Sequence, residues 1–246
     1  MLPRAWMLVG LLTFSVAFSA RADDSARLRE NFDFGWRFYK GDATGADQPA
    51  FDDSGWRKLN LPHDWSIEGP LSQTEPAGGA GGFFPTGIGW YRKHFTAPEA
   101  LRGKKISLTF DGVYMNSDVY LNGHLLGHRP YGYSTFQYDI TPYLNYGTTP
   151  NVVSVRVDDS AQPASRWYGG AGIYRNVWIT ATEPVHVAQW GTYVTTPTVT
   201  ADAASVWART EVQNETAAAE NVTVVSQIVD DKGAVVASAE APVSVP

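Results

Sequence analysis

Alternation of apolar and polar residues predicts β-strands along much of the chain. Residues 106–110 and 153–157 place valine, isoleucine, leucine or phenylalanine at every second position. This period of two is typical of a strand with one buried face. Residues 119–121 alternate in the same way up to Asn122-Gly123, a strong signal for a tight hairpin turn. Leu125 and Leu126 are then expected on the return strand.

A further strand is predicted at residues 173–180, which carry large side chains at odd and even positions alike. No stretch of ten residues has apolar positions at the i, i+3, i+4 and i+7 spacing of an amphipathic helix. Short strands separated by Gly, Pro and Asn turns are typical of a sandwich or jelly roll. The expected fold class is therefore all-β, with a jelly-roll β-sandwich at residues 23–184.

The composition changes near Glu183-Pro184, where we expect a domain boundary. Residues 185–246 are rich in Ala, Val and Thr, and strands are predicted at 206–212, 222–229 and 234–239, with a tight turn at Asp231–Gly233. An immunoglobulin-like sandwich needs about 100 residues and about seven strands. We therefore expect 185–246 to be an incomplete immunoglobulin-like sandwich. The alternative is a small complete sandwich with an open sheet edge.

The first 22 residues have the pattern of a signal peptide. Arg4 is followed by an apolar run from Trp6 to Phe18, and Ala20-Arg21-Ala22 offers a cleavage site before Asp23. The run is shorter than the roughly 20 apolar residues of a membrane-spanning helix. The expected location is the periplasm or the medium, without a membrane anchor. A buried N-terminal helix is the alternative.

Charge and composition exclude several classes of protein and site. The 246 residues include 19 Lys and Arg against 25 Asp and Glu, and the net charge of −6 argues against a nucleic-acid partner. The chain has no cysteine, which excludes disulfides and thiolate metal sites. There is no P-loop and no Gly-x-Ser-x-Gly motif, and Gly170–Gly172 lacks the third glycine of a dinucleotide loop. His124 and His128 flank a predicted hairpin with no glutamate beside them, so we expect neither a metal nor a cofactor.

Two predicted loops are rich in glycine and aromatic residues, at 76–90 and 158–170. Loops on a rigid sandwich are common binding sites, and aromatic rings pack on the apolar faces of sugars. The alternative is that these rings only close the ends of the sandwich.

Four segments together resemble one family. Residues 61–65, 87–93, 119–124 and 166–177 are similar to motifs of the N-terminal sugar-binding domain of family 2 glycoside hydrolases, and most of all to that of bacterial β-galactosidases. The resemblance covers about residues 27–184, and residue 185 onward resembles the start of the family's immunoglobulin-like second domain. It implies a retaining enzyme that hydrolyses terminal β-linked sugars.

The same resemblance implies that catalysis depends on residues outside this chain. Retaining glycosidases use two carboxylates about 5–5.5 Å apart, and the family carries both on a downstream (β/α)₈ barrel. Asn214-Glu215 mimics the family's acid/base dipeptide but falls in a predicted turn, so we interpret it as coincidence. No catalytic residue is therefore assigned, and the chain alone is expected to be inactive.

The resemblance also suggests a sugar site. Asp159, in the loop expected after strand 153–157, corresponds to an aspartate that helps to hold the sugar, and Arg166 and Trp167 are neighbours. Residues 77–89 depart from the family pattern, so no contact residue is assigned there. The expected partners are a β-galactoside or related glycan and the catalytic barrel. The alternatives are a lectin-like module without hydrolysis and a structural sandwich that mediates protein contacts.

Overall fold

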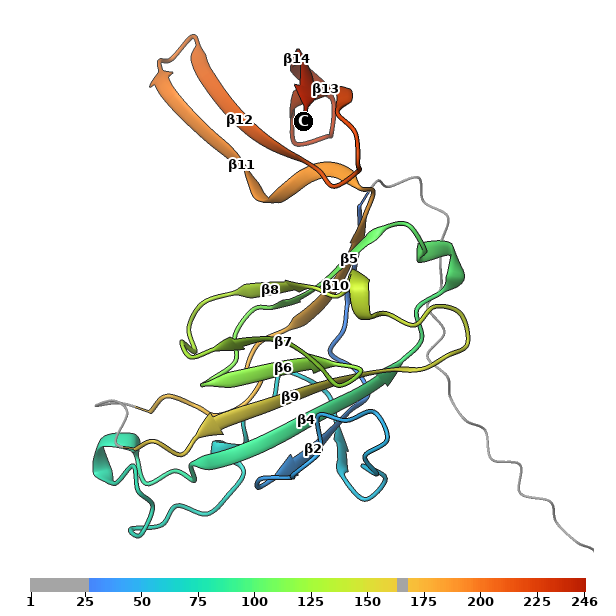
Figure 1. The fold of residues 1–246 in the computed structure, drawn as a ribbon. Coiled ribbons are helices and arrows are strands. Elements are labelled where there is room, and N and C mark those ends of the chain that lie inside the picture. Colours follow the sequence, from blue (N-terminus) through green and yellow to red (C-terminus); the bar gives the residue numbers. More distant parts are fainter. Residues whose placement is uncertain (1–26, 163–167) are drawn as a thin grey trace, which may run out of the picture.

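The computed structural model describes residues 27–162 and 168–246, and nearly all of its regular structure is β (Figure 1). The strands are β1 (Arg27–Asn31), β2 (Trp36–Lys40), β3 (Arg57–Leu59), β4 (Gly87–Phe95), β5 (Lys105–Phe110), β6 (Ser117–Leu121), β7 (His124–Arg129), β8 (Phe136–Asp139), β9 (Asn151–Asp159), β10 (Val177–Thr182), β11 (Val185–Val199), β12 (Ala204–Asn214), β13 (Glu220–Val229) and β14 (Val235–Val245). Four 3₁₀ turns, η1 (Trp65–Ile67), η2 (Gly79–Gly81), η3 (Glu99–Leu101) and η4 (Thr141–Tyr143), complete the described elements. Within the described ranges, no helix is long and apolar enough to cross a membrane.

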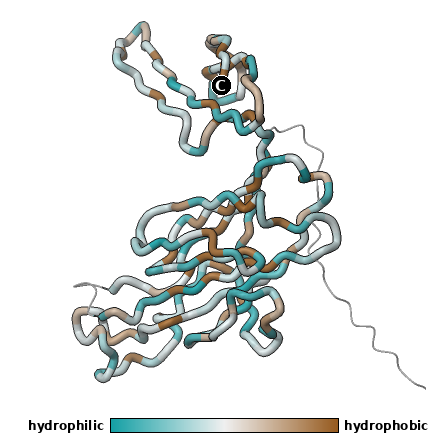
Figure 2. Tube along the Cα trace, viewed as in Figure 1, coloured by the Kyte–Doolittle hydropathy of each residue, from teal (hydrophilic) through white to brown (hydrophobic). Residues whose placement is uncertain are grey.

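Two antiparallel sheets face each other and form a sandwich. One has the order β3-β2-β4-β9-β6-β7 and the other β1-β10-β5-β8. The alternating apolar residues of β5, β6, β9 and β10 point between the sheets and are buried together. Figure 2 shows this hydrophobic layer inside the sandwich. The predicted all-β sandwich is confirmed.

Local turn chemistry explains the predicted hairpin between β6 and β7. Asn122 and Gly123 both have positive φ, 51° and 85°, which matches the right-handed twist of the two strands. Residues 106–110, 119–121 and 153–157 all lie within strands, as expected from their alternation.

The prediction of a strand over residues 173–180 is wrong at its start, because β10 begins only at Val177. The residues before it bond to loops instead of a neighbouring strand. The Ile173 carbonyl accepts from the His63 backbone N–H at 2.9 Å, and the Tyr174 hydroxyl donates to the Gly132 carbonyl at 2.9 Å. The Ile173 carbonyl is thus bonded to a loop, and before Val177 the Asn176 carbonyl accepts from the Asp111 N–H at 3.0 Å.

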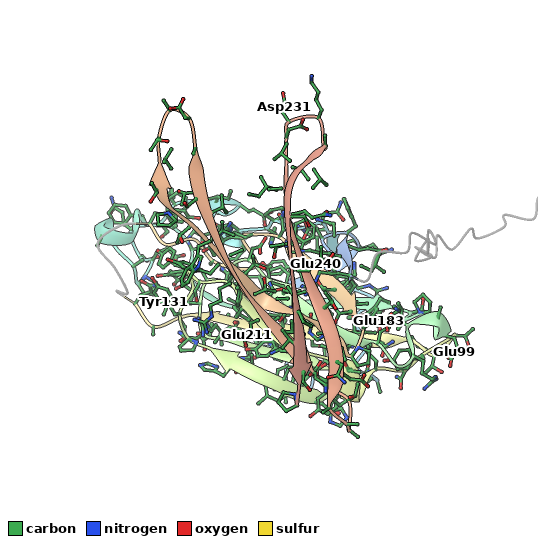
Figure 3. The ribbon with its side chains drawn as sticks, turned by 90° about the horizontal axis from the view of Figure 1, so that it is seen from above. Glu99, Tyr131, Glu183, Glu211, Asp231 and Glu240 are labelled. Carbon is green, nitrogen blue, oxygen red and sulfur yellow. The ribbon has the colours of Figure 1, made fainter. Side chains whose placement is uncertain are left out.

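Residues 185–245 form two hairpins, β11–β12 and β13–β14, each a separate two-stranded sheet. The three strands predicted in this region are present, and Gly233, with φ +83°, closes the turn next to Asp231 (Figure 3). Side chains of both hairpins, including Val206 and Val224, line one open hollow. The domain bounds 23–184 and 185–246 and the immunoglobulin-like assignment stay predictions. The signal peptide lies outside the described residues.

Candidate sugar-binding site

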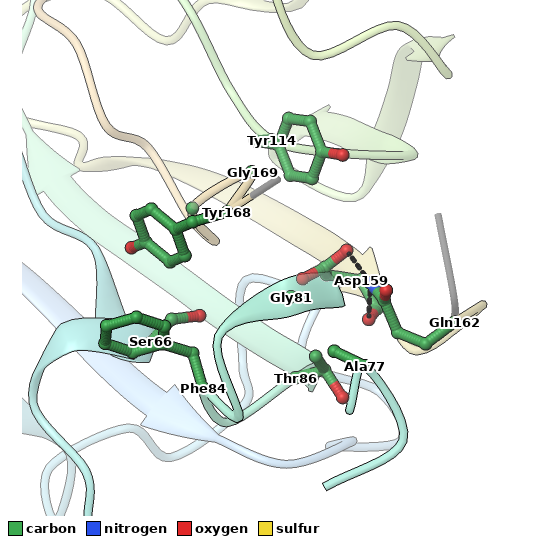
Figure 4. A pocket seen from close by; sticks show the side chains of 11 residues that line it. Ser66, Ala77, Gly81, Phe84, Thr86, Tyr114, Asp159, Gln162, Tyr168 and Gly169 are labelled. Carbon is green, nitrogen blue, oxygen red and sulfur yellow. Dashed lines mark hydrogen bonds between the residues drawn. The ribbon is translucent and has the colours of Figure 1, made fainter. Parts of the chain in front are cut away.

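A pocket lies at the end of the sandwich where β9 ends and β4 begins (Figure 4). Its cavity volume is about 20 Å³, room for about one water molecule, and the pocket opens to solvent. The lining residues come from η1, the glycine-rich loop, the loop after β5, the end of β9 and the loop before β10: Ser66, Ala77, Gly81, Phe84, Thr86, Tyr114, Asp159, Gln162, Tyr168, Gly169 and Gly170. The structure thus brings together both of the glycine- and aromatic-rich loops.

Asp159 is the carboxylate of this pocket. It is the last residue of β9, opposite Gly87 of β4, so its predicted position in a loop after the strand is corrected. The ladder with β4 continues two residues beyond the apolar alternation, which the sequence pattern alone does not show. Strand alternation turns Asp158 toward Arg156 and Ser160, whereas the buried Asp159 side chain accepts a hydrogen bond from Gln162 Nε2 at 2.8 Å.

The surroundings of Asp159 favour its neutral form. Burial raises its pKa from 3.8 to about 7, and the negative charges of Asp64 and Asp158 act in the same direction. The hydrogen bond from Gln162 and the positive charge of Lys40 lower the pKa but do not offset the burial. Asp159 therefore changes its charge near neutral pH, while its side chain faces the pocket.

Replacing Asp159 with asparagine is expected to change the free energy of unfolding more favourably at pH 8 than at pH 5. In the unfolded chain the carboxyl loses its proton near 3.8, and in the folded protein near 7. Between these values the folded state binds more protons, so stability falls as the pH rises through this window. Urea denaturation of the natural chain and the variant at both pH values measures the difference.

The control for this prediction is Asp202→Asn, because Asp202 is exposed and lies in the turn between β11 and β12. Its effect on the free energy of unfolding should be the same at pH 5 and pH 8. An Asp159→Asn effect that also does not change with pH would contradict the assigned titration.

Asp64 joins two loops of the site. It caps η1 by accepting from the Ser66 backbone N–H at 2.9 Å, and it accepts from the Ala171 N–H at 3.0 Å. The Tyr168 hydroxyl donates to its other oxygen. The Tyr168 ring also contacts Phe84, with ring centroids 4.5 Å apart. Asp64 therefore fixes the position of an aromatic wall of the pocket.

A buried network supports the site from below. His63 Nδ1 lies 2.7 Å from the Tyr91 hydroxyl oxygen, and His63 Nε2 lies 3.2 Å from Glu68 Oε2. Burial lowers the pKa of His63, although the hydrogen bond and the charge of Glu68 act in the opposite direction. Arg57 forms an ion pair with Glu68 at the surface. The network holds the loop that carries Asp64 against the six-stranded sheet.

The structure thus adds three pocket residues that sequence reasoning did not assign, Phe84, Tyr114 and Tyr168, together with Asp64, which holds Tyr168 in place. Asp64 and Tyr168 lie in motifs that carry the family resemblance, whereas Phe84 lies in the loop from which no contact was carried over. Arg166 and Trp167 lie outside the described residues. His128 pairs with Asp118 at 2.7 Å while His124 stacks on Tyr143. In residues 27–162 and 168–246, no cluster of three His, Asp or Glu side chains could hold a metal ion.

Comparison with known proteins agrees with this architecture. Residues 89–188 match the family described as glycosyl hydrolase 2 galactose-binding domain-like. The chain is 54% identical over 213 residues to Beta-galactosidase BoGH2A of Bacteroides ovatus. This match covers 87% of this chain and 25% of that protein. The chain is 33% identical over 245 residues to a beta-glucuronidase of Formosa agariphila, covering 90% of this chain and 25% of the relative.

Solved structures show the same relationship. A glycosyl hydrolase family 2 member from Bacteroides cellulosilyticus superimposes with a TM-score of 0.85 at 40% identity, over 89% of this chain and 29% of that one. The chain spans about a quarter of the length of the curated relatives named above. Through the galactose-binding-like domain at residues 89–188, the chain therefore belongs to glycosyl hydrolase family 2.

Proposed function

We propose that this chain is the sugar-binding part of an exported, retaining family 2 glycosidase that acts on β-galactosides. The observation that carries the proposal is the buried carboxylate of Asp159 in a pocket with aromatic walls, Tyr114 on one side and Tyr168 with Phe84 on another. A carboxylate accepts hydrogen bonds from sugar hydroxyls, and aromatic rings cover the apolar faces of a pyranose. The signal-like residues 1–22 support export.

The charges of the pocket favour a neutral sugar over a uronic acid. Asp64 and Asp158 act on Asp159 as neighbouring negative charges, and Lys40 is the positive group that acts on it. Lys40 donates to the Thr86 carbonyl at 2.8 Å. A bound glucuronate would bring a further negative charge to this group of carboxylates. The described residues therefore support a galactoside more strongly than a glucuronide.

In this proposal the chain binds and orients the sugar, and a catalytic barrel supplies the reacting carboxylates. The role of the barrel is inferred from the family resemblance and not from a residue of this chain. Glu215 follows β12, and its Oε1 lies 3.3 Å from Lys105 Nζ. Neither residue lines the pocket. Asp159 would hold the terminal sugar by its hydroxyls while the barrel closes the open side of the site.

Titration of the purified chain with methyl β-galactoside tests the proposal. We expect a millimolar Kd, corresponding to about −4 kcal/mol, because a half-open pocket leaves much of the sugar in water. Asp159→Asn should weaken binding at least fivefold, whereas the exposed control Asp202→Asn should not change it. Methyl β-glucuronide should bind more weakly than the galactoside.

Three results would contradict parts of this proposal. Binding that survives Asp159→Asn unchanged would place the sugar elsewhere. Tighter binding of the glucuronide would reverse the choice of substrate class. Micromolar binding that depends on Asp159 would favour the alternative of a lectin-like module, because such a module must hold its glycan without help from a barrel.

A further inference from the structure

A row of tyrosines leads away from the pocket along the loop between β7 and β8. The Tyr114 ring lines the pocket and lies 5.3 Å, centroid to centroid, from the Tyr133 ring. Tyr133 in turn lies 5.7 Å from Tyr131. Figure 3 shows Tyr131 at the end of the sandwich away from Glu99, which is also the end that holds the pocket. We call Tyr114, Tyr131 and Tyr133 the tyrosine row.

The outer two rings of the tyrosine row do not belong to the core. Tyr131 is 58% exposed and Tyr133 is 45% exposed. Large aromatic side chains exposed side by side indicate a contact surface more often than a scattered single ring does. Tyr133 adjoins the pocket through its contact with the buried Tyr114 ring.

The loop that carries these rings is held in one place. A Cβ on Gly132 would lie 2.3 Å from the Tyr114 ring, so the backbone of Gly132 packs directly on that ring. The Gly132 carbonyl accepts from the Tyr174 hydroxyl at 2.9 Å, and the Pro130 carbonyl accepts from the Asn116 N–H at 3.3 Å. The rings are therefore presented on a fixed backbone, which lowers the entropic cost of binding.

We propose that Tyr131 and Tyr133 form a second sugar subsite, which binds the internal units of a β-linked oligosaccharide whose terminal unit occupies the Asp159 pocket. This inference rests on the proposed function. The Tyr131 and Tyr133 rings meet edge to face at an interplanar angle of 64°, so together they offer a bent aromatic surface to sugar units beyond the terminal one. Each tyrosine offers both an apolar face and a hydroxyl, the combination that a sugar requires. The preferred substrate is thus an oligosaccharide and not a simple galactoside.

The test compares two probes, methyl β-galactoside and β-1,4-galactotriose, by titration of the purified chain. The natural chain should bind the trisaccharide about tenfold more tightly than the monosaccharide. The double variant Tyr131→Ala/Tyr133→Ala should bind the trisaccharide only as tightly as the monosaccharide, with monosaccharide binding unchanged. The control is Tyr193→Ala, because Tyr193 is exposed on β11 outside the tyrosine row.

Saturation-transfer NMR on the natural chain gives a readout that does not depend on the folding of a variant. Saturation should reach protons of the second and third sugar rings. Transfer confined to the terminal ring, or equal affinity for the two probes, would overturn the second subsite while the pocket assignment stands. If neither probe binds, both the subsite and the proposed function are wrong.

Discussion

Replacing Arg92 with methionine is expected to lower the free energy of unfolding by about 3–5 kcal/mol, because it breaks a buried ion pair and leaves buried loop carbonyls without their donor. Arg92, on β4, is fully buried, and its Nε donates to Asp53 Oδ2 at 2.8 Å. Its Nη1 donates to the Gln48 carbonyl at 3.1 Å and to Ser154 Oγ at 3.0 Å. One guanidinium thus holds the loop before β3 against the six-stranded sheet.

Asp53 is the carboxylate that loses a hydrogen-bond donor in this change. Burial acts to raise its pKa, but hydrogen bonds from Arg92 and His94 outweigh burial and hold the pKa below 3.8. Without Arg92, the buried Asp53 carboxylate keeps Arg37 and His94 but loses one of its donors, and the loop carbonyls lose theirs. Asp53→Asn combined with Arg92→Met should therefore be less destabilised than the sum of the two single changes, because Asp53 and Arg92 act as one pair.

Urea denaturation measures both effects, with Arg102→Met as the matched control. Arg102 is exposed and pairs with Glu99 three residues away, so its replacement should leave the unfolding midpoint unchanged. A midpoint for Arg92→Met as high as that of the control would contradict the assigned contribution of these buried contacts to stability.

Replacing Gly172 with alanine is expected to lower the free energy of unfolding by about 3 kcal/mol or more, as the sum of backbone strain and overpacking. Gly172 has φ +119°, which L side chains rarely adopt. A Cβ there would lie 2.2 Å from the Tyr91 hydroxyl oxygen and 2.8 Å from the His63 carbonyl oxygen. The His63 carbonyl belongs to the backbone, so it cannot move aside as a flexible side chain could.

The same change should also weaken sugar binding. The Gly172 carbonyl accepts from the Tyr114 N–H at 2.9 Å, and the Gly172 N–H donates to the Tyr114 carbonyl at 2.8 Å. A shift of Gly172 therefore moves an aromatic wall of the pocket. Gly233→Ala is the control, since Gly233 has φ +83° but nothing within 4 Å of its Cβ position. A loss of stability for Gly172→Ala no larger than that of the control would contradict the close contacts as its cause.

Local sequence patterns predict much of the fold. Alternation with a period of two turns one side of residues 106–110 and 153–157 toward the core, and burial of that side is sufficient to make each segment a strand. Asn122-Gly123 accepts the positive φ values of a hairpin turn without help from distant residues. The family resemblance, carried by four short motifs in order, is a property of the sequence in the same sense.

The pocket could be predicted only in outline. The family resemblance suggests Asp159 and the composition suggests the two aromatic loops, but the partners of these residues in the pocket lie far apart in the chain. Asp64 accepts hydrogen bonds from residues more than one hundred positions away, and no pattern around Asp64 shows this. Phe84 is an ordinary loop residue until Tyr168 packs on it.

The sequence by itself determined that the chain is all-β, where most of its strands run and which family it belongs to, because these depend on side-chain periodicity, turn residues and short motifs. Only the tertiary structure decided that β10 begins at Val177, that Asp159 ends a strand inside a pocket and that the Tyr114 ring of that pocket contacts Tyr133. The physical reason is that hydrogen-bond partners and burial are set by segments that meet in space. A carboxyl group acquires a pKa near 7 only when other loops close around it.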